Sequence, residues 1–247
     1  KKMINRCQAG IASVLLATGD FGGALCILRT TNSYGPTALA LMRAGEPSEA
    51  YAMALKVKDR FKGRRTKYYV LKSFVAVCDV FLQLYENSVR HRELGRQQSS
   101  ELGRQARTGS LAKPSFAGSF AAPHRQATSG GEGSLDTEQY EDPDTLQAMC
   151  QEWIDKLTQF STVYALAGPR TQLCRGRLKL ISGSPAEGLK LMRRSQQLAA
   201  KMAMPYDEAL ALQLLSRHTK TSVRESQQAA QEAQALFSRL GVADPGL

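Results

Sequence analysis

Side chains that could carry catalysis are few in this sequence, and their spacing does not match a known reaction centre. The segment Gly183 to Lys190 (GSPAEGLK) comes closest to a phosphate-binding loop. Such a loop needs Gly-x-x-x-x-Gly-Lys-Ser/Thr, because its backbone amides and its lysine hold the phosphates. Here Leu189 stands where the lysine should be, and no hydroxyl follows. We therefore expect no nucleotide at this segment.

The three histidines, His91, His124 and His218, do not form a metal-binding pattern with each other or with cysteines. Zinc sites place two ligands a few residues apart, and neither an HExxH pair nor a Cys/His cluster occurs. His218 falls at the end of a predicted helix, where a cation interacts favourably with the helix dipole. The sequence predicts no metal and no cofactor.

Neighbouring carboxylates occur in two places, at Glu141–Asp144 and at Asp207–Glu208. Each group lies beside a proline at the predicted start of a helix, where acidic side chains stabilise the amide-rich end. General acid or base catalysis needs a pocket that perturbs pKa values, and the sequence indicates none. We expect no catalytic residue, so this chain is not predicted to be an enzyme.

The densest charged feature is a run of seven basic residues within 12 positions, interrupted by one acid, Asp59. Its members are Lys56, Lys58, Arg60, Lys62, Arg64, Arg65 and Lys67. Gly63 would break the helix there and leave an exposed basic turn. This turn is either an ordinary solvated connection or the candidate partner-binding surface.

The net charge of +11 is compatible with an acidic partner. No motif that reads RNA or DNA is present, so we expect a protein partner with an acidic surface and no nucleic acid.

Ala and Leu dominate an apolar content of 43%, which favours helices because straight side chains lose little rotamer freedom there. The most apolar segment, Tyr68–Tyr85, contains Lys72 and Asp79 and is shorter than the roughly 20 residues of a membrane span. We interpret it as a buried helix and expect no membrane insertion. The absence of a signal-peptide pattern predicts a cytoplasmic protein, and Lys1 at the start predicts a fragment of a longer chain.

The five cysteines contain no CxxC pair and lie in apolar segments, so they are predicted to be buried, reduced thiols. They are Cys7, Cys26, Cys78, Cys150 and Cys174.

Composition divides the chain into a helical block at 1–87, a linker at 88–143 and a second helical block at 144–247. The linker is low in complexity and too polar to offset its ordering entropy, so we expect disorder, although its first part, to about Gln105, could continue a helix.

Arg107 lies three residues before Ser110, a spacing that basophilic kinases favour, which makes Ser110 a candidate phosphosite. About ten helices and no strand are predicted.

Two helix starts carry a capping-box spacing, at Ser184 with Glu187 and at Ser222 with Glu225. Gly241 is predicted to end the last helix. Three predicted turns share one form: Gly ends a helix, and a small residue follows five positions later. These pairs are Gly19 and Ala24, Gly45 and Ala50, and Gly183 and Gly188.

This turn resembles the inter-helix turn of tetratricopeptide repeats, in which small residues let paired helices pack closely. The first two turns are 26 residues apart, against 34 in that repeat, so another α-solenoid class stays open. The stretch from Gly176 to Val242, with GLKLMRRSQQLAAKMAMPYDEALALQLLSRH, is similar to the C-terminal repeats of soluble-type adenylate and guanylate cyclases and related signal-transduction ATPases. The resemblance implies an all-α fold, an α-solenoid of antiparallel helix pairs, and carries over no catalytic residue.

We therefore predict a non-catalytic scaffold segment of a larger intracellular signalling protein. Two alternatives stay open: a structural subunit of a large assembly such as the ciliary axoneme, and the regulatory C-terminal region of a soluble-type nucleotidyl cyclase. The residues upstream of Lys1 separate them, because a cyclase domain would support the second and further repeats the first.

Overall fold

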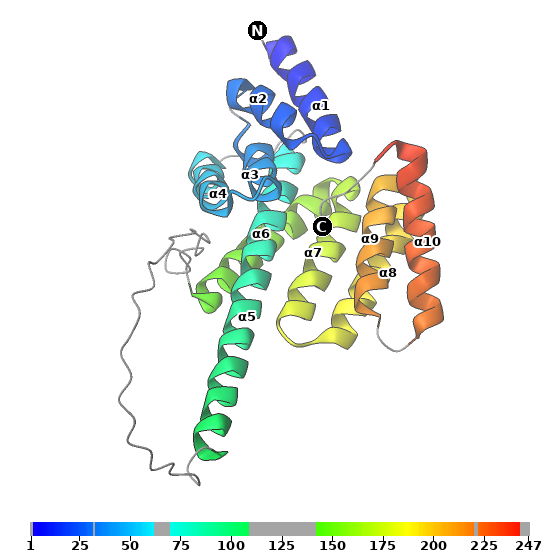
Figure 1. Cartoon of the computed structure of the whole chain (residues 1–247). Coiled ribbons are helices and arrows are strands. Elements are labelled where there is room, and N and C mark those ends of the chain that lie inside the picture. Colours follow the sequence, from blue (N-terminus) through cyan, green and yellow to red (C-terminus); the bar gives the residue numbers. More distant parts are fainter. Residues whose placement is uncertain (1, 32, 62–69, 109–141, 220–221, 243–247) are drawn as a thin grey trace, which may run out of the picture.

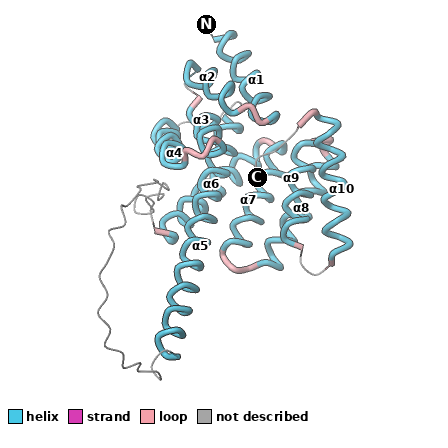
Figure 2. The backbone as a smooth tube through the Cα atoms, viewed as in Figure 1, coloured by secondary structure: helices cyan, strands magenta, loops and turns pink. Residues whose placement is uncertain are grey.

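The computed structural model describes residues 2–31, 33–61, 70–108, 142–219 and 222–242. These residues form ten α-helices and one 3-10 helix, with no strand among them (Figures 1 and 2). The helices are α1 (Lys2–Thr18), α2 (Phe21–Thr31), α3 (Tyr34–Arg43), α4 (Pro47–Phe61), α5 (Leu71–Thr108), α6 (Pro143–Val163), η4 (Ala165–Ala167), α7 (Gly168–Ile181), α8 (Pro185–Lys201), α9 (Pro205–His218) and α10 (Val223–Leu240). The all-α class and the number of helices predicted from the sequence are confirmed.

Glycines in the left-handed conformation end several helices, as the sequence predicted. The φ angle is +87° at Gly19, +82° at Gly45 and at Gly183, and +67° at Gly241. After each glycine the next amide donates a hydrogen bond to a carbonyl five residues back, for example from Ser184 to Lys179 at 2.8 Å. This closes the end of the helix because it satisfies carbonyls that have no partner within the helix.

A further turn of the same kind joins α8 to α9 without a glycine. Ala203 adopts a φ of +52°, and the amide of Met204 donates to the carbonyl of Ala199 at 2.9 Å. An alanine in this conformation brings its Cβ close to the backbone, so the site holds strain that a glycine would lack.

Of the two predicted capping boxes, one forms a side-chain cap and the other does not. Ser222 Oγ accepts a hydrogen bond from the amide of Glu225 at 3.2 Å. Ser184 makes no side-chain cap, so the prediction there is wrong, and Glu187 instead lies 3.0 Å from Lys179. The helix that begins at Pro143 is capped by Asp142, which accepts from the amide of Asp144 at 2.8 Å.

Small residues at the helix crossings allow close contact between α7 and α8. A Cβ atom placed on Gly188 would lie 2.8 Å from the carbonyl oxygen of Gly176 and 2.8 Å from Leu180 Cγ. Ala24 and Ala50, the corresponding residues after the first two turns, are fully buried. The small residue five positions after each glycine therefore lies in a helix contact at all three turns.

The larger hydrophobic core is shared by helices from both sides of residues 109–141. Phe74 of α5 packs edge-on against Trp153 and Phe160 of α6, with ring centroids 5.4 Å and 6.2 Å apart. Helix α5 also contacts α7 and α3. The two expected blocks, 1–87 and 144–247, thus meet in one core, and their description as separate units stays a prediction.

Helix α5 is longer than the buried helix expected at Tyr68–Tyr85. It continues to Thr108, so residues 88–108 of the expected linker are helical, and residues 91–100 are all exposed. In Figure 1 this half of α5 projects away from the other helices. Residues 109–141 lie outside the described ranges.

A second, smaller core joins α8, α9 and α10, which lie next to each other at the C-terminal end (Figure 1). Its buried side chains include Met192, Leu210 and Phe237. Each of these helices packs against the next one in the chain. Among the described helices, none has the combination of length and apolar character that crossing a bilayer requires.

Candidate functional site

A cavity of about 390 Å³ lies where α1, α3 and α5 meet η4, α7 and α9. Most of its wall is apolar. The large apolar side chains that line it are Leu16, Leu39, Leu71, Val75, Leu166 and Met204. Five charged side chains and one phenol join them: Arg43, Lys72, Asp79, Arg170, Asp207 and Tyr206. No stretch of sequence contains these groups together, because six elements contribute them.

Arg170 is the centre of the charged part of the cavity. Its Nε donates a short hydrogen bond to the carboxylate of Asp207 in α9, and its Nη1 lies 3.7 Å from Asp79 Oδ2 in α5. The guanidinium also lies over the ring of Tyr206, 5.5 Å from the centroid, which is within the limit of about 6 Å for a cation–π contact. Burial opposes its charged form, but the two carboxylates outweigh this effect and raise the pKa of Arg170 above its ordinary value.

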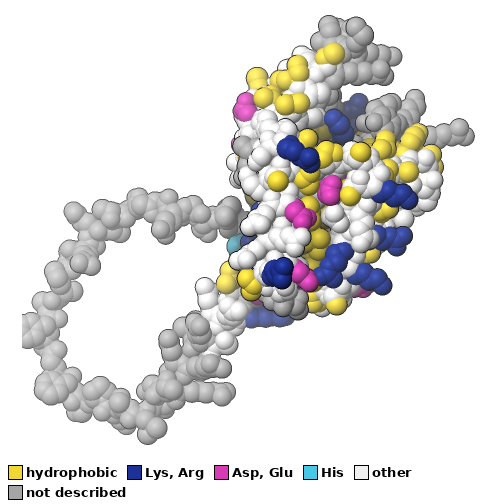
Figure 3. Space-filling model, turned by 90° about the vertical axis from the view of Figure 1, so that its right-hand side faces the viewer, with side chains coloured by type: hydrophobic (Ala, Val, Ile, Leu, Met, Phe, Trp, Pro, Cys, Tyr) yellow, Lys and Arg dark blue, Asp and Glu magenta, His cyan; other side chains and the backbone are white. Residues whose placement is uncertain are grey.

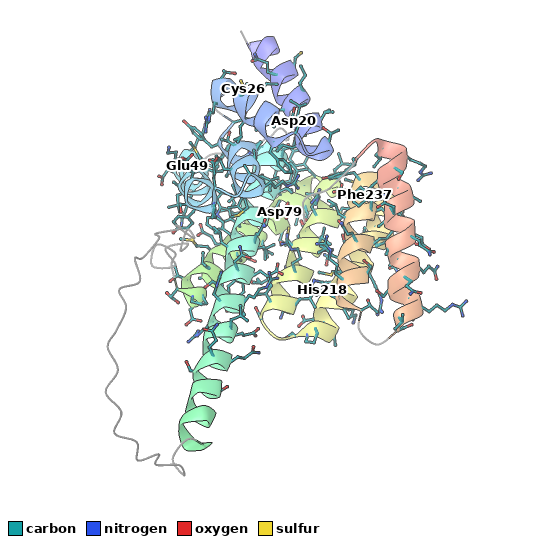
Figure 4. All side chains as sticks on the ribbon, viewed as in Figure 1. Asp20, Cys26, Glu49, Asp79, His218 and Phe237 are labelled. Carbon is teal, nitrogen blue, oxygen red and sulfur yellow. The ribbon has the colours of Figure 1, made fainter. Side chains whose placement is uncertain are left out.

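Asp79 binds a second arginine on its other side. Arg177 Nη1 lies 3.2 Å from Asp79 Oδ1, and Arg177 Nη2 lies 3.8 Å from Glu86. Glu86 is in turn 3.1 Å from Arg90 along α5. Figure 4 shows Asp79 near the middle of the molecule, on the part of α5 that faces the other helices.

The network is balanced in charge, since three arginines face three carboxylates. Its members connect α5 to α7 and α7 to α9, and the Asp79, Arg170 and Arg177 side chains are 10%, 13% and 9% exposed. Removing Asp79 would leave the buried charges of Arg170 and Arg177 without this partner, which costs far more than an exposed pair gains. The network therefore positions three helices around the cavity.

Two further cations in the cavity wall, Arg43 and Lys72, are not part of that network. Arg43 Nη1 donates to the carbonyl of Leu16 at 3.1 Å, and its buried Nε has no hydrogen-bond partner in the described part of the chain. Lys72 Nζ lies 3.3 Å from the hydroxyl of Ser13. Neither cation forms an ion pair with a described carboxylate, so this wall carries surplus positive charge.

The predicted basic run is only partly covered by the structure. Lys58 lies 2.9 Å from Glu152 of α6, and the guanidinium of Arg60 lies 5.2 Å from the ring centroid of Tyr34. Lys56 Nζ lies 3.9 Å from the sulfur of Met53. The Lys58 and Arg60 contacts connect α4 to α6 and α3, whereas the Lys56 contact lies within α4. The other four members, Lys62, Arg64, Arg65 and Lys67, lie outside the described residues, so this partner surface stays a prediction.

The remaining candidates do not converge on one place. His91 is exposed on α5 and His218 ends α9, while Ser110 and His124 lie outside the described ranges. The described residues contain no group of three or more His, Cys, Asp or Glu that could hold a metal ion. Asp207 does lie in the first turn of α9, as expected, but it also lines a cavity that the sequence did not predict.

One residue in the sequence, Asp79, could have indicated that charged groups meet near this cavity. A carboxylate inside an apolar run of a helix needs a buried cationic partner, and that requirement could have pointed to the arginines of α7.

The cysteines divide into two groups, which corrects the expectation that all five are buried. Cys7 and Cys26 are exposed, whereas Cys78, Cys150 and Cys174 are buried where α5, α6 and α7 meet. Burial raises the pKa of the Cys150 thiol to about 12 and that of Cys78 well above its ordinary value. These two thiols stay protonated at neutral pH, so they act as packing groups and not as nucleophiles.

The chain matches no model of a known protein family, no curated protein and no solved structure. The similarity to tetratricopeptide repeats and to the cyclase-type C-terminal region therefore stays a prediction from the sequence.

Proposed function

We propose that the chain is a non-catalytic protein interaction segment of a larger intracellular signalling protein, built as a TPR-like α-solenoid of antiparallel helix pairs. The turns at Gly19, Gly45 and Gly183 support this architecture, because each glycine has the same left-handed conformation and a small residue follows five positions later. The packing of α7 on α8, α8 on α9, and α9 on α10 supports it as well.

The observation that carries the proposal is a row of exposed cations on α8. Lys190, Arg194 and Lys201 are exposed and follow one face of the helix, with exposed Gln197 between the last two. None of the three cations forms an ion pair within the described residues, whereas neighbouring Arg193 is 3.7 Å from Glu225. An uncompensated row of this kind favours an acidic partner by electrostatic complementarity.

Lys and Arg side chains are also spread over the face of the molecule on the α10 side, with Asp and Glu side chains among them (Figure 3). This distribution agrees with the net charge of +11. The predicted basic surface at Lys56–Lys67 would add to the attraction of an acidic partner.

The test is a triple charge reversal of the α8 row, Lys190→Glu with Arg194→Glu and Lys201→Glu, in the tagged full-length protein. All three side chains are exposed, so the fold should be retained. We expect partners recovered from cells to fall by at least about tenfold, which corresponds to ~1.4 kcal/mol of binding free energy.

The matched control is Arg92→Glu with Arg96→Glu, which reverses two exposed cations on the projecting part of α5. This control should recover the same partners as the unmodified protein. If the triple variant and the unmodified protein recover equal amounts of partner, the proposal that the α8 surface binds the partner is refuted. Charge reversal at Arg64 and Arg65 in the same assay tests the predicted basic run.

The projecting half of α5 favours a second candidate, a structural subunit of a large assembly. Its residues 91–100 are exposed all round, which is typical of helices that bridge between neighbours. The test deletes residues 91–108 and compares how much of the shortened and of the unmodified protein is incorporated into the cytoskeletal fraction. Unchanged incorporation would exclude a bridging role for this helix.

A further inference from the structure

We propose that the cavity between α1, α3, α5 and α9 binds a small molecule with one anionic group on an apolar body, such as a short aryl or alkyl carboxylate. This site is separate from the α8 surface, and its occupant is a different class of partner. Four features of the cavity carry the proposal: an unsatisfied cation, a second cation beside it, apolar walls, and carboxylates that are already paired with Arg170.

The unsatisfied cation is Arg43, at the end of α3. One of its nitrogens donates to the carbonyl of Leu16, at 3.1 Å, but the buried Nε has no hydrogen-bond partner among the described residues. Arg43 lines the cavity, so a carboxylate bound there would neutralise the charge of the guanidinium and accept a charge-assisted hydrogen bond from it.

Lys72 brings a second cation to the same place. Its Nζ contacts Ser13 of α1 at 3.3 Å, and Arg43 contacts Leu16, three residues further along that helix. Three residues correspond to about 4.5 Å along a helix axis, so both cationic groups reach α1 within one turn of each other. One carboxylate can therefore interact with both.

The apolar walls define the rest of the ligand. Leu39, Val75 and Met204 line the cavity, and Leu166 also lines it although 43% of its surface is exposed. The volume of about 390 Å³ falls in the range of roughly 300–1,000 Å³ that is usual for small-molecule sites. A ligand body of this kind would cover apolar surface that is now in contact with water.

The charge balance limits the ligand to one anionic group. Asp79 and Asp207 also line the cavity, but both are bound to Arg170. A second anionic group would have to lie beside these carboxylates, where it would be repelled. A cationic ligand would be repelled by Arg43 and Lys72, so a singly charged anion fits best.

The experiment uses three probes of nearly equal shape: 4-phenylbutyrate, 4-phenylbutan-1-ol and 4-phenylbutylamine. Binding to the full chain is measured by saturation-transfer NMR titration. We expect 4-phenylbutyrate to bind at one site at least about tenfold more tightly than the alcohol, and the amine not to bind, because only the carboxylate satisfies both cations.

Variants connect the binding to the cavity. Lys72→Glu changes an exposed side chain and should keep the fold, as the thermal unfolding curve will show. It should weaken 4-phenylbutyrate binding at least about tenfold, and Arg43→Gln should do the same. Arg224→Gln, which changes an exposed cation of α10 outside the cavity lining, should leave binding unchanged.

Equal binding of the acid and the alcohol, or unchanged binding by Lys72→Glu, would overturn the proposal. A capped Leu-Asp-Leu peptide serves as the competing probe. If only the peptide shows binding that depends on Lys72, the cavity belongs to a protein interface and the small-molecule proposal fails. Neither result bears on the α8 surface, which the triple charge reversal tests separately.

Discussion

Arg177 Nη1 lies 3.2 Å from Asp79 Oδ1, although the two residues are 98 positions apart in the chain. Their side chains are 9% and 10% exposed, so water screens the pair only slightly. Asp79 also faces Arg170, and the three residues hold α5 against α7 beside the candidate cavity. Substitutions in this ion-pair network therefore test whether it holds α5 and α7 in position around the cavity.

Asp79→Ala should destabilise the fold strongly, because it leaves Arg170 and Arg177 buried beside an empty space. Breaking a buried ion pair by removing one partner costs about 3–5 kcal/mol. The loss is measured as a change in the free energy of unfolding in urea.

Glu86→Gln is the matched control for that experiment. The Glu86 side chain is 36% exposed and its distance to Arg177 is 3.8 Å, so the change should cost less than about 1 kcal/mol. Similar losses for the two variants would contradict a special role of Asp79.

Ala203→Gly should stabilise the chain, since glycine adopts the φ of +52° at this turn without the Cβ contact that alanine makes. The greater freedom of glycine in the unfolded chain offsets part of this gain, so we expect the free energy of unfolding to increase by about 0.5–1 kcal/mol. Thermal unfolding followed by circular dichroism measures it. Gly183→Ala, at an equivalent turn, should lower the stability by about 1–2 kcal/mol.

Gly188→Ala should lower stability by about 1–3 kcal/mol, because the added methyl group meets backbone and not only a flexible side chain. The contact is the carbonyl oxygen of Gly176, at 2.8 Å from the added Cβ. Gly95→Ala, in the exposed part of α5 with nothing within 4 Å, should instead raise stability by about 0.5–1 kcal/mol. A stabilising Gly188→Ala would show that α7 and α8 separate without cost.

Glu152 predicts a pH dependence that a variant can isolate. Burial raises its pKa, but hydrogen bonds from Lys156 and Lys58 outweigh this and lower the pKa from the ordinary value of 4.5. A carboxylate with a lowered pKa in the folded state stabilises the fold above its unfolded pKa, and this contribution is lost as the pH falls through the folded pKa.

Glu152→Gln should therefore be less stable than the unmodified chain at pH 7, by less than about 1 kcal/mol because the carboxylate is 38% exposed. The difference should disappear well below pH 4.5. Urea unfolding of both proteins at several pH values measures it. A difference that grows as the pH falls would contradict the assigned contacts.

Local patterns in the sequence predicted the helices well. The helices α6 and α9 begin at Pro143 and Pro205, beside the carboxylates where helix starts were predicted, and Gly45 ends α3 in a left-handed turn. Such features depend on residues close together in the chain, where steric rules for proline and glycine act directly.

Features that depend on tertiary contacts were missed. Ser184 has the residue type of a helix cap but makes no cap, and Ala203 adopts a conformation that alanine rarely adopts. The cavity was not predicted because its charged groups come from α3, α5, α7 and α9, and their proximity follows from packing and not from spacing.

The larger core has a consequence for how the chain holds together. Trp153 and Phe160 pack on Phe74, and Arg177 binds Asp79, so the helices before residue 109 and those after residue 141 contact each other through both apolar and ionic groups. These tertiary contacts connect the two parts of the chain in addition to the peptide backbone. Two separately expressed fragments, 1–108 and 142–247, should therefore reassemble by complementation. Co-elution in size-exclusion chromatography measures this, and Asp79→Ala in the first fragment should weaken it.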